Sequence, residues 1–286
     1  MKAIIIFLAI IMLAACGSSD SSGVPEETLP PTDETPVMTP TMQPTPEPTP
    51  EPTPEPMRIP VPTLRPVTSG FPGMRTFAEP RRPMIALTFD DGPSQYTTAI
   101  LDVLEEHGGR ATFFVLGNRV GRSADIILRA RELGNEIANH SWQHRQFPRL
   151  TADELRDEEF RRTSNAIAEV IGYSVPMMRP PYGLYNDDVL EVARELGYII
   201  VNWNMDPMDW RDRDADIIAQ RILNNARNGS VVVLHDIRAP TAEAMAYVIP
   251  RLIEEGFEIV TISEMLHNSN TVIESGRVFR GLARSN

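Results

Sequence analysis

From Arg81 onward, the 286-residue chain alternates short apolar runs with longer amphipathic segments. Apolar runs of about four to eight residues are typical of buried strands, whereas longer segments with apolar positions three or four apart are typical of helices. The runs predicted as strands are Met84–Phe89, Ala111–Leu116, Glu136–Asn139, Tyr198–Asn202, Ser230–Leu234 and Phe257–Thr261. The segments predicted as helices are Tyr96–His107, Ser123–Leu133, Ala152–Ile171, Asp187–Leu196, Ala215–Asn228 and Thr241–Glu255.

A glycine follows each predicted helix, as expected at helix ends, which often adopt a left-handed conformation. These glycines are Gly108, Gly134, Gly172, Gly197, Gly229 and Gly256. Alternating strands and helices imply an α/β fold with a parallel sheet and helices outside it. Six or seven such units favour a barrel over an open, doubly wound sheet. No glycine-rich phosphate-binding loop follows a predicted strand, so the sequence gives no support for a nucleotide site.

The amino terminus has the pattern of a bacterial export signal. Met1–Lys2 is a short basic region, and the thirteen residues Ala3–Ala15 carry no charge. A bilayer span needs about 20 apolar residues, so this run fits a signal peptide better than a membrane helix. The stretch Leu13-Ala14-Ala15-Cys16 resembles a lipoprotein lipobox, and we expect cleavage after residue 15 to leave a lipid on Cys16. An ordinary secretory signal or an uncleaved anchor is the alternative.

Residues 16–80 are rich in proline, threonine and glutamate. They hold 17 of the 26 prolines, and the sequence TPEP occurs three times within Thr45–Pro56. Such a composition favours extended polyproline II conformations and cannot bury a core. We expect a disordered tether between the lipid anchor and a folded domain at 81–267, although a proline-rich ligand for a recognition module is an alternative. The polar segment 268–286 carries no motif and is expected to be a mobile tail.

Composition and charge exclude several classes of site. The chain has 27 Lys and Arg against 39 Asp and Glu, for a net charge of −12. Such an acidic chain is a poor candidate for binding nucleic acid, because it would not displace counterions from phosphates. The single cysteine rules out an intrachain disulfide and a cysteine-rich zinc site.

Charged, histidine and aromatic residues gather where the predicted strands end. The carboxyl ends of parallel strands carry the functional site in α/β folds, so these residues are expected to meet. The segments are Asp90-Asp91-Gly92-Pro93, His140-Ser141-Trp142-Gln143-His144, Arg179-Pro180-Pro181-Tyr182-Gly183, Asp206-Pro207-Met208-Asp209-Trp210 and His235-Asp236.

The first two of these segments suit a divalent metal. His140 and His144 lie four residues apart, a spacing that presents both imidazoles on one helical or turn face. Asp91 completes a two-histidine, one-carboxylate set that leaves positions open for water and substrate. Taken alone, such histidine pairs are common on surfaces, and adjacent acids such as Asp90 and Asp91 often form a solvated turn. Their position between a buried strand and the rigid Gly92-Pro93 turn favours a functional site.

Five segments, in order, resemble the motifs of the polysaccharide deacetylases, carbohydrate esterase family four, with its nodulation-type chitooligosaccharide deacetylase domain. They are Thr88-Phe89-Asp90-Asp91-Gly92-Pro93, His140-Ser141-Trp142-Gln143-His144, Arg179-Pro180-Pro181-Tyr182-Gly183, Asp206-Pro207-Met208-Asp209-Trp210 and Val233-Leu234-His235. The resemblance covers roughly Arg81 to Leu266 and implies a distorted (β/α) barrel of seven or eight units. One departure is Val233, which stands where the family usually has leucine and would border the acetyl methyl group.

The resemblance implies a metal-dependent deacetylase, usually with zinc and sometimes with cobalt, nickel or manganese. Asp91, His140 and His144 match the metal ligands of the family. Asp90 matches the general base that accepts a proton from the metal-activated water, and Arg179 matches the residue that keeps this base ionised.

The remaining motif residues match the acid and the substrate contacts. His235 matches the general acid that protonates the leaving amine, and Asp209 matches the residue that orients it. Tyr182 supplies the first backbone N–H after two prolines, which have none, and is expected to stabilise the oxyanion. Trp210, Tyr182 and Val233 are expected to contact the substrate, with Trp142 and Tyr185 as further aromatic candidates.

These inferences together predict an enzyme that removes acetyl groups from N-acetylglucosamine in peptidoglycan or a related wall glycan. Chitooligosaccharides and O-acetylated xylan remain alternative substrates. A non-catalytic glycan-binding lipoprotein is a further alternative, but it would have lost a base, ligand or acid, and none is lost here. We expect a monomer with no nucleic-acid partner. Cys16 would attach it to the outer face of a bacterial cell membrane, from which it reaches into the wall.

Overall fold

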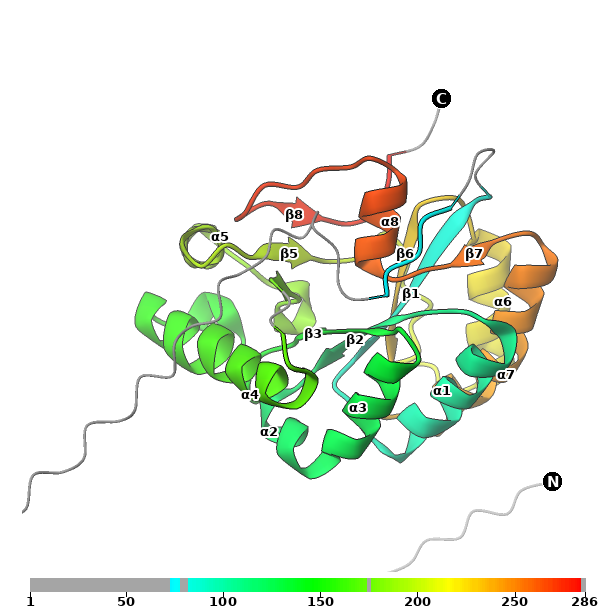
Figure 1. The fold of residues 1–286 in the computed structure, drawn as a ribbon, viewed down its shortest axis with the longest axis horizontal. Helices are drawn as coiled ribbons and strands as arrows, with labels where there is room; N and C mark the ends of the chain where they lie inside the picture. The colour runs from blue at the N-terminus through cyan, green and yellow to red at the C-terminus, as the bar shows by residue number, and fades with distance from the viewer. Residues whose placement is uncertain (1–72, 78–81, 174–175, 284–286) are drawn as a thin grey trace, which may run out of the picture. The chain divides into compact units, whose positions relative to one another are not determined.

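A computed structural model describes residues 73–77, 82–173 and 176–283 of the chain. The expected signal segment, Cys16 and the linker as far as residue 72 lie outside the described residues. The described chain forms a parallel sheet with helices around it (Figure 1).

Within the described residues, eight parallel strands form one sheet in the order β6-β1-β2-β3-β4-β5-β8, and β7 pairs with β1. The strands are β1 (Met84–Asp90), β2 (Thr112–Val115), β3 (Glu136–Asn139), β4 (Met177–Met178), β5 (Ile199–Val201), β6 (Ser230–His235), β7 (Glu258–Ile259) and β8 (Val278–Phe279). After β5 the chain returns to the first strand of this order, because Met205 forms a parallel bridge with Val232 of β6. The sheet therefore curves back on itself, and the predicted distorted (β/α) barrel is confirmed.

All six predicted helices are present. The α-helices are α1 (Gln95–His107), α2 (Gly117–Val120), α3 (Ala124–Glu132), α4 (Arg162–Ile171), α5 (Asp187–Glu195), α6 (Ala215–Asn225), α7 (Ala239–Glu254) and α8 (Ile262–Asn268). A π-helix, η4 (Glu154–Arg161), leads directly into α4, and shorter 3₁₀ turns are η2 (Gly121–Ser123), η3 (Phe147–Arg149) and η5 (Pro181–Gly183). In the described part of the chain, no helix combines the length and apolar character that a membrane span requires.

Local sequence explains where the helices begin and end. The Ser94 side chain accepts a hydrogen bond from the backbone N–H of Tyr96, while Thr97 bonds back to the N–H of Ser94, a reciprocal cap at the start of α1. Gly108 ends α1 with φ of 67°, and Gly172 ends α4 with φ of 82°. Both values lie in the left-handed region that glycine adopts without a steric penalty.

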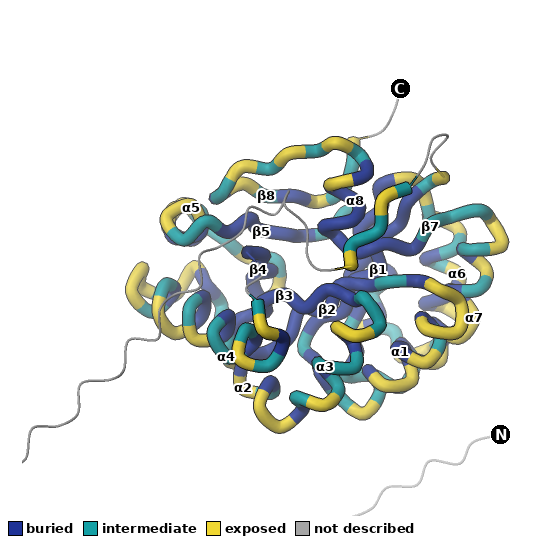
Figure 2. Tube along the Cα trace, viewed as in Figure 1, coloured by how far each residue is buried: buried dark blue, intermediate teal, exposed yellow. Residues whose placement is uncertain are grey.

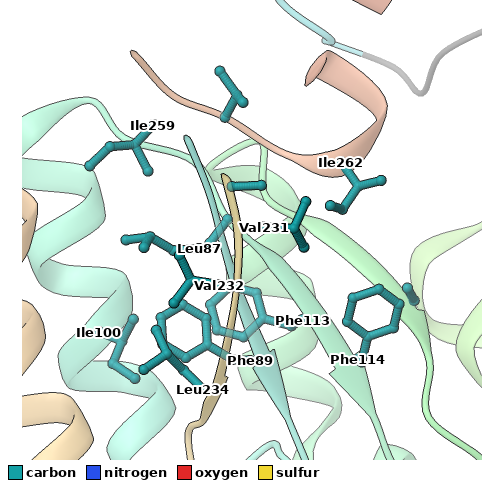
Figure 3. Packing of buried hydrophobic residues seen from close by; sticks show 14 of the residues in the cluster. Leu87, Phe89, Ile100, Phe113, Phe114, Val231, Val232, Leu234, Ile259 and Ile262 are labelled. Atoms are coloured by element: carbon teal, nitrogen blue, oxygen red, sulfur yellow. The ribbon is translucent and has the colours of Figure 1, made fainter. Parts of the chain in front are cut away.

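The core explains why the strands read as continuous apolar runs. All seven residues of β1 are buried, because helices cover one side of the sheet and the barrel interior the other (Figure 2). Leu87 and Phe89 pack with Leu234 of β6 and with Ile100 of α1 (Figure 3). Successive strand residues point to opposite faces, so Asp90 follows Phe89 with its side chain on the other face. The alternation of β1 thus directs this carboxylate into the barrel.

The carboxyl-terminal segment differs from the expected mobile tail. Val278 and Phe279 form β8, which pairs in parallel with β5, and Phe279 is buried. Beyond β8, the N–H of Leu282 donates to the carbonyl of Gly229 at 3.0 Å. A two-residue strand within a polar segment is too short to produce an alternating pattern, so no local pattern predicts it.

Part of the predicted linker also packs on the domain. The Arg75 guanidinium donates to both carboxylate oxygens of the fully buried Glu264 in α8, at 3.0 and 2.9 Å. The N–H of Phe77 donates to the Asn268 side chain at 2.8 Å. Residues 73–77 therefore belong structurally with the barrel, although their sequence was grouped with the linker that ends at residue 80.

Candidate active site

Most of the strand-end site residues predicted from the sequence line one pocket of about 540 Å³, and Arg179 and Asp209 contact residues of its lining. The side chains come from the carboxyl ends of β1, β3 and β6 and from the loops after β4 and β5. The pocket is lined by Asp90, Asp91, His140, His144, Tyr182, Trp203, Asp206, Trp210, Val233, His235 and Arg238. This convergence at one end of a parallel sheet is the arrangement expected of an active site in such folds.

A fully buried arginine holds the first carboxylate of the pocket. Arg179 Nη1 donates to Asp90 Oδ1 at 2.7 Å and to Thr88 Oγ1 at 2.7 Å. Its Nε donates to the carbonyl of Val201 at 3.0 Å, and its guanidinium lies 4.1 Å from the Phe114 ring centroid. Burial lowers the pKa of Arg179 and the charge of Asp90 opposes this, so the guanidinium stays ionised. The ion pair occupies Asp90 Oδ1 and leaves Oδ2 free to face the pocket.

Asp91, His140 and His144 form a cluster that could hold a divalent cation. Asp91 Oδ1 lies 3.5 Å from His140 Nε2 and 3.3 Å from His144 Nε2. One donor atom from each residue lies within 4.8 Å of the others. An oxygen and two imidazole nitrogens, with room for further ligands, suit a divalent transition metal.

The structure explains the orientation of the two imidazoles. His140 Nδ1 donates to the carbonyl of Arg179 at 2.8 Å, which leaves Nε2 as the lone-pair nitrogen directed at Asp91. The histidines do not lie on a helix. They lie in a turn after β3, in which Ser141 and His144 adopt positive φ angles of 76° and 66°. The Asn139 side chain accepts from the N–H of Ser141 at 2.7 Å and thereby braces this turn.

The electrostatics of the cluster fit a bound cation. Asp91 Oδ1 is buried and accepts no hydrogen bond from the described residues, although the Nε2 atoms of His140 and His144 face it at 3.5 and 3.3 Å. Burial raises the pKa of Asp91, but the adjacent imidazoles, His140 first, bring it below its usual range. Burial lowers the pKa of His140, but the charges of Asp90 and Asp91 outweigh burial, so the pKa of His140 is raised. The pKa of His144 is lowered by burial and by the neighbouring His140. A divalent cation would satisfy the orphaned oxygen and replace the imidazolium proton.

A second histidine–carboxylate pair borders the pocket. His235 Nδ1 donates to Asp209 Oδ1 at 2.8 Å, and the buried Asp209 also accepts from the His235 N–H and from Thr241 Oγ1, each at 2.7 Å. Burial lowers the pKa of His235, but the hydrogen bond and charge of Asp209 outweigh it and raise the pKa to about 9. The imidazole is therefore held protonated, with Nε2 as the nitrogen left to meet a ligand.

The loop after β4 presents a free backbone donor. Tyr182 has a φ of 60°, a conformation that costs free energy in a non-glycine residue and often marks a functional site. The N–H groups of Gly183 and Leu184 donate to the carbonyls of Pro180 and Pro181 at 2.9 and 3.1 Å. The Tyr182 N–H has no acceptor among the described residues, which fits the predicted oxyanion donor.

Aromatic residues form part of the pocket wall, but not all those suggested by the sequence. Trp210, with 48% of its surface exposed, donates to Asp206 Oδ2 at 3.3 Å. Val233 and Tyr182, two of the residues expected to contact the substrate, line the pocket, together with Trp203, which the sequence did not single out. Neither Trp142 nor Tyr185 lines it. The Trp142 ring packs against the Arg162 guanidinium, and the Tyr185 hydroxyl accepts a hydrogen bond from Arg280.

Two buried acids brace the pocket from behind. Asp236 accepts from Thr97 Oγ1 at 2.5 Å and lies so close to Gly92 that an added Cβ would be 2.2 Å from Asp236 Oδ2. Burial raises the pKa of Asp236 to about 7. In the η4 helix, Glu159 accepts from the Trp142 N–H at 2.7 Å and ties the histidine turn to this π-helix. Both contacts join different structural elements, at sequence separations of 139 and 17 residues, so no local pattern could indicate them.

Comparison with known proteins identifies the family. The polysaccharide deacetylase family model matches residues 78–201. The chain is 39% identical over 188 residues to the peptidoglycan-N-acetylmuramic acid deacetylase PdaC of Bacillus subtilis. The aligned region covers 65% of this chain and 39% of that protein. It is 34% identical over 189 residues to a peptidoglycan-N-acetylglucosamine deacetylase of Bacillus cereus, and this aligned region covers 64% of this chain and 88% of that protein. The chain belongs to the polysaccharide deacetylase family.

A solved structure supports the same assignment. A family 4 acetyl xylan esterase of Clostridium thermocellum, solved with a cobalt ion, matches with a TM-score of 0.65 and 30% identity, over 70% of this chain and 98% of that one. The resemblance drawn from the five motifs is thus confirmed, and polysaccharide deacetylases use a divalent metal. The chain spans about two fifths of the length of the first curated relatives it matches, PdaC among them.

Proposed function

We propose that this polysaccharide deacetylase is a metal-dependent hydrolase that removes N-acetyl groups from N-acetylglucosamine residues of a cell-wall glycan, and that this glycan is peptidoglycan. One observation carries the proposal. The Asp91–His140–His144 cluster lines the same pocket as a carboxylate and an imidazole. The carboxylate is Asp90, which is ion-paired with Arg179, and the imidazole is His235, which is hydrogen-bonded to Asp209. Hydrolysis of an amide needs a base for the attacking water and an acid for the leaving amine, and the pocket offers one of each.

The three cluster residues would hold the metal, and zinc is the ion we propose, with cobalt, nickel or manganese as alternatives. When bound, such an ion polarises the acetyl carbonyl and acidifies the attacking water. Asp90 Oδ2 lies 3.9 Å from His140 Nε2, close enough to the cluster to accept the proton of that water. Arg179, bonded to Oδ1, keeps the Asp90 carboxylate in position and leaves Oδ2 for the proton.

His235 would act as the acid. Asp209 fixes its Nδ1, so the proton on Nε2 can pass to the amine nitrogen as the carbon–nitrogen bond breaks. The Tyr182 N–H would donate to the oxyanion that develops on the attacked acetyl group, a contact worth about 3–4 kcal/mol in comparable sites. Val233 and the face of Trp210 would contact the acetyl methyl group and the sugar ring.

The substrate is tested by acetate release from three glycans: N-acetylglucosamine oligomers, purified peptidoglycan and acetylated xylan. We expect release from peptidoglycan at the highest kcat/KM. Preference for the oligomers would favour a chitooligosaccharide deacetylase, and preference for xylan an O-deacetylase. Release from none of them would favour a non-catalytic glycan-binding protein, although the pocket retains every group that the reaction needs.

We further propose that the protein acts as a monomer outside the cytoplasm, anchored at Cys16 and extended into the wall by the linker. The support comes from the apolar amino-terminal segment, Cys16 and the proline-rich linker in the sequence, and from relatives that are named as peptidoglycan deacetylases. Deleting Thr45–Pro56 should reduce action on intact walls while leaving turnover of a soluble oligomer unchanged. An equal loss on both substrates would argue against a spacer. Cys16→Ser should release the protein from the membrane fraction.

A further inference from the structure

The charged groups that line the pocket each face an opposite charge, an imidazole or a hydrogen-bond donor, with one exception. Asp90 is bonded to Arg179, and Asp91 faces two imidazoles. Asp206 accepts from the N–H of Met208 at 2.7 Å and from the indole of Trp210 at 3.3 Å. The exception is Arg238.

Among the described residues, Arg238 is the one lysine or arginine that lines this pocket. Its side chain has no hydrogen-bond or ion-pair partner within the described chain. It is half-buried, lies three residues after His235, and immediately precedes α7. Its Nε is buried without a hydrogen-bond acceptor, and no carboxylate of the described chain lies within ion-pair distance of the guanidinium. Other arginines of the domain, such as Arg179 and Arg145, are held by buried carboxylates.

An unpaired guanidinium in a pocket is costly unless a ligand satisfies it. Burying a polar group without a hydrogen-bond partner is unfavourable, and burying part of a charged group is more so. The planar guanidinium fork matches a carboxylate, which can accept two parallel hydrogen bonds from it. Hydroxyl groups of a neutral sugar satisfy such a fork less well, because they cannot balance its charge.

We propose that Arg238 binds a carboxylate carried by the substrate close to the acetamide that is cleaved. This inference rests on the proposed function, because it assumes that the pocket accepts an acetylated amino sugar. It narrows the substrate class to glycans with acidic substituents. In peptidoglycan the carboxylate can come from the lactyl ether of muramic acid in strands without peptides, or from the stem peptide in intact strands. Chitooligosaccharides and acetylated xylan carry neither group.

The test compares kcat/KM on a neutral N-acetylglucosamine oligomer, on glycan strands stripped of stem peptides, and on strands that retain them. Arg238→Gln should lower the ratio of acidic to neutral kcat/KM about tenfold or more, as expected for a lost charge-assisted hydrogen bond. Arg238→Lys should restore part of the ratio. Raising the salt concentration should lower the wild-type ratio in the same direction. If the ratio of Arg238→Gln falls on strands without stem peptides, the carboxylate that Arg238 binds is that of the lactyl group. If it falls on strands that retain them, the carboxylate belongs to the stem peptide.

Arg122→Gln is a matched control, because Arg122 is exposed, lies outside the pocket lining and carries the same charge. It should leave the ratio unchanged. If Arg238→Gln lowers turnover equally on acidic and neutral glycans, or lowers neither, the proposal is wrong. Failure of the wild-type protein to release acetate from any glycan would instead overturn the proposed function.

A second measurement needs no variant and so does not depend on the folding of Arg238→Gln. Wild-type turnover of the neutral oligomer is inhibited with muramic acid or with glucosamine, which differ by the lactyl carboxylate. We expect muramic acid to inhibit at a concentration about tenfold lower. Equal inhibition by the two sugars would contradict the proposal.

Discussion

Arg179 Nη1 donates to Asp90 Oδ1 at 2.7 Å, and both side chains are shielded from solvent. The same arginine, through its backbone carbonyl, accepts from His140 Nδ1 at 2.8 Å. One residue from the loop after β4 therefore positions both the proposed base after β1 and a proposed metal ligand after β3. The proposed base and this proposed metal ligand are therefore linked through a buried arginine.

Removal of Arg179 should cost stability as well as activity. Arg179→Met leaves the buried Asp90 carboxylate without its partner, and breaking such a pair costs about 3–5 kcal/mol. Thermal unfolding of the purified variant measures this. Arg161→Met is the control, because its ion pair with Asp157 is solvent-exposed and should change the unfolding free energy little. Similar destabilisation by the two variants would contradict a special role for the buried pair.

Metal binding should depend on His140 and not on Asp90. His140→Ala removes one of three ligands, so the metal content of the dialysed protein, measured by elemental mass spectrometry, should fall below one tenth of the wild-type value. Asp90→Asn has nearly the same shape and lies outside the ligand set, so it should retain the ion. Full metal content in His140→Ala would show that the ion binds elsewhere.

Activity should fall on the alkaline side as His235 loses its proton. The pKa of this group is raised to about 9, so the acid is protonated below that pH and is lost as pH rises through it. A cation bound nearby repels the imidazolium, so the alkaline limb of kcat/KM in the metal-loaded enzyme should lie between about 6.5 and 9.

Asp209→Asn removes the charge that raises this pKa, so it should move the alkaline limb to lower pH, with reduced turnover at all pH values. The pH profile of kcat/KM measures both effects. The folded-state pKa is raised, so the Asp209–His235 pair stabilises the fold below about 6.5 and this contribution disappears as pH rises through about 9. An unchanged alkaline limb in Asp209→Asn would exclude His235 as the acid.

The close approach of Gly92 and Asp236 should appear as an energetic coupling. A Cβ on Gly92 would lie 2.2 Å from Asp236 Oδ2, so Gly92→Ala should destabilise the fold by about 1–3 kcal/mol. The cost should shrink when Asp236 is also changed to Ala, because the clash is then relieved. Gly121→Ala is the control, since its added Cβ would meet nothing within 4 Å. Additive effects of the Gly92 and Asp236 changes on the unfolding free energy would contradict the coupling.

The sequence predicted those features that depend on local pattern. The strand Met84–Phe89, with its carboxylates at the carboxyl end, was evident because apolar runs and parallel-sheet topology determine where its end lies. Features that depend on contacts between distant segments were not evident. The turn that carries His140 and His144 is braced through Asn139 by the π-helix before α4. The lack of a partner for the Arg238 guanidinium likewise depends on the tertiary structure, which no sequence pattern specifies.

Acetate release from purified peptidoglycan tests the central claim most directly. The wild-type protein should release acetate, should stop when a chelator removes the metal, and should recover when zinc is added back. Asp90→Asn, still carrying its metal, should be slower by at least about 100-fold, because the base is gone. Undiminished release in excess chelator, or a near-wild-type rate in metal-loaded Asp90→Asn, would contradict the account.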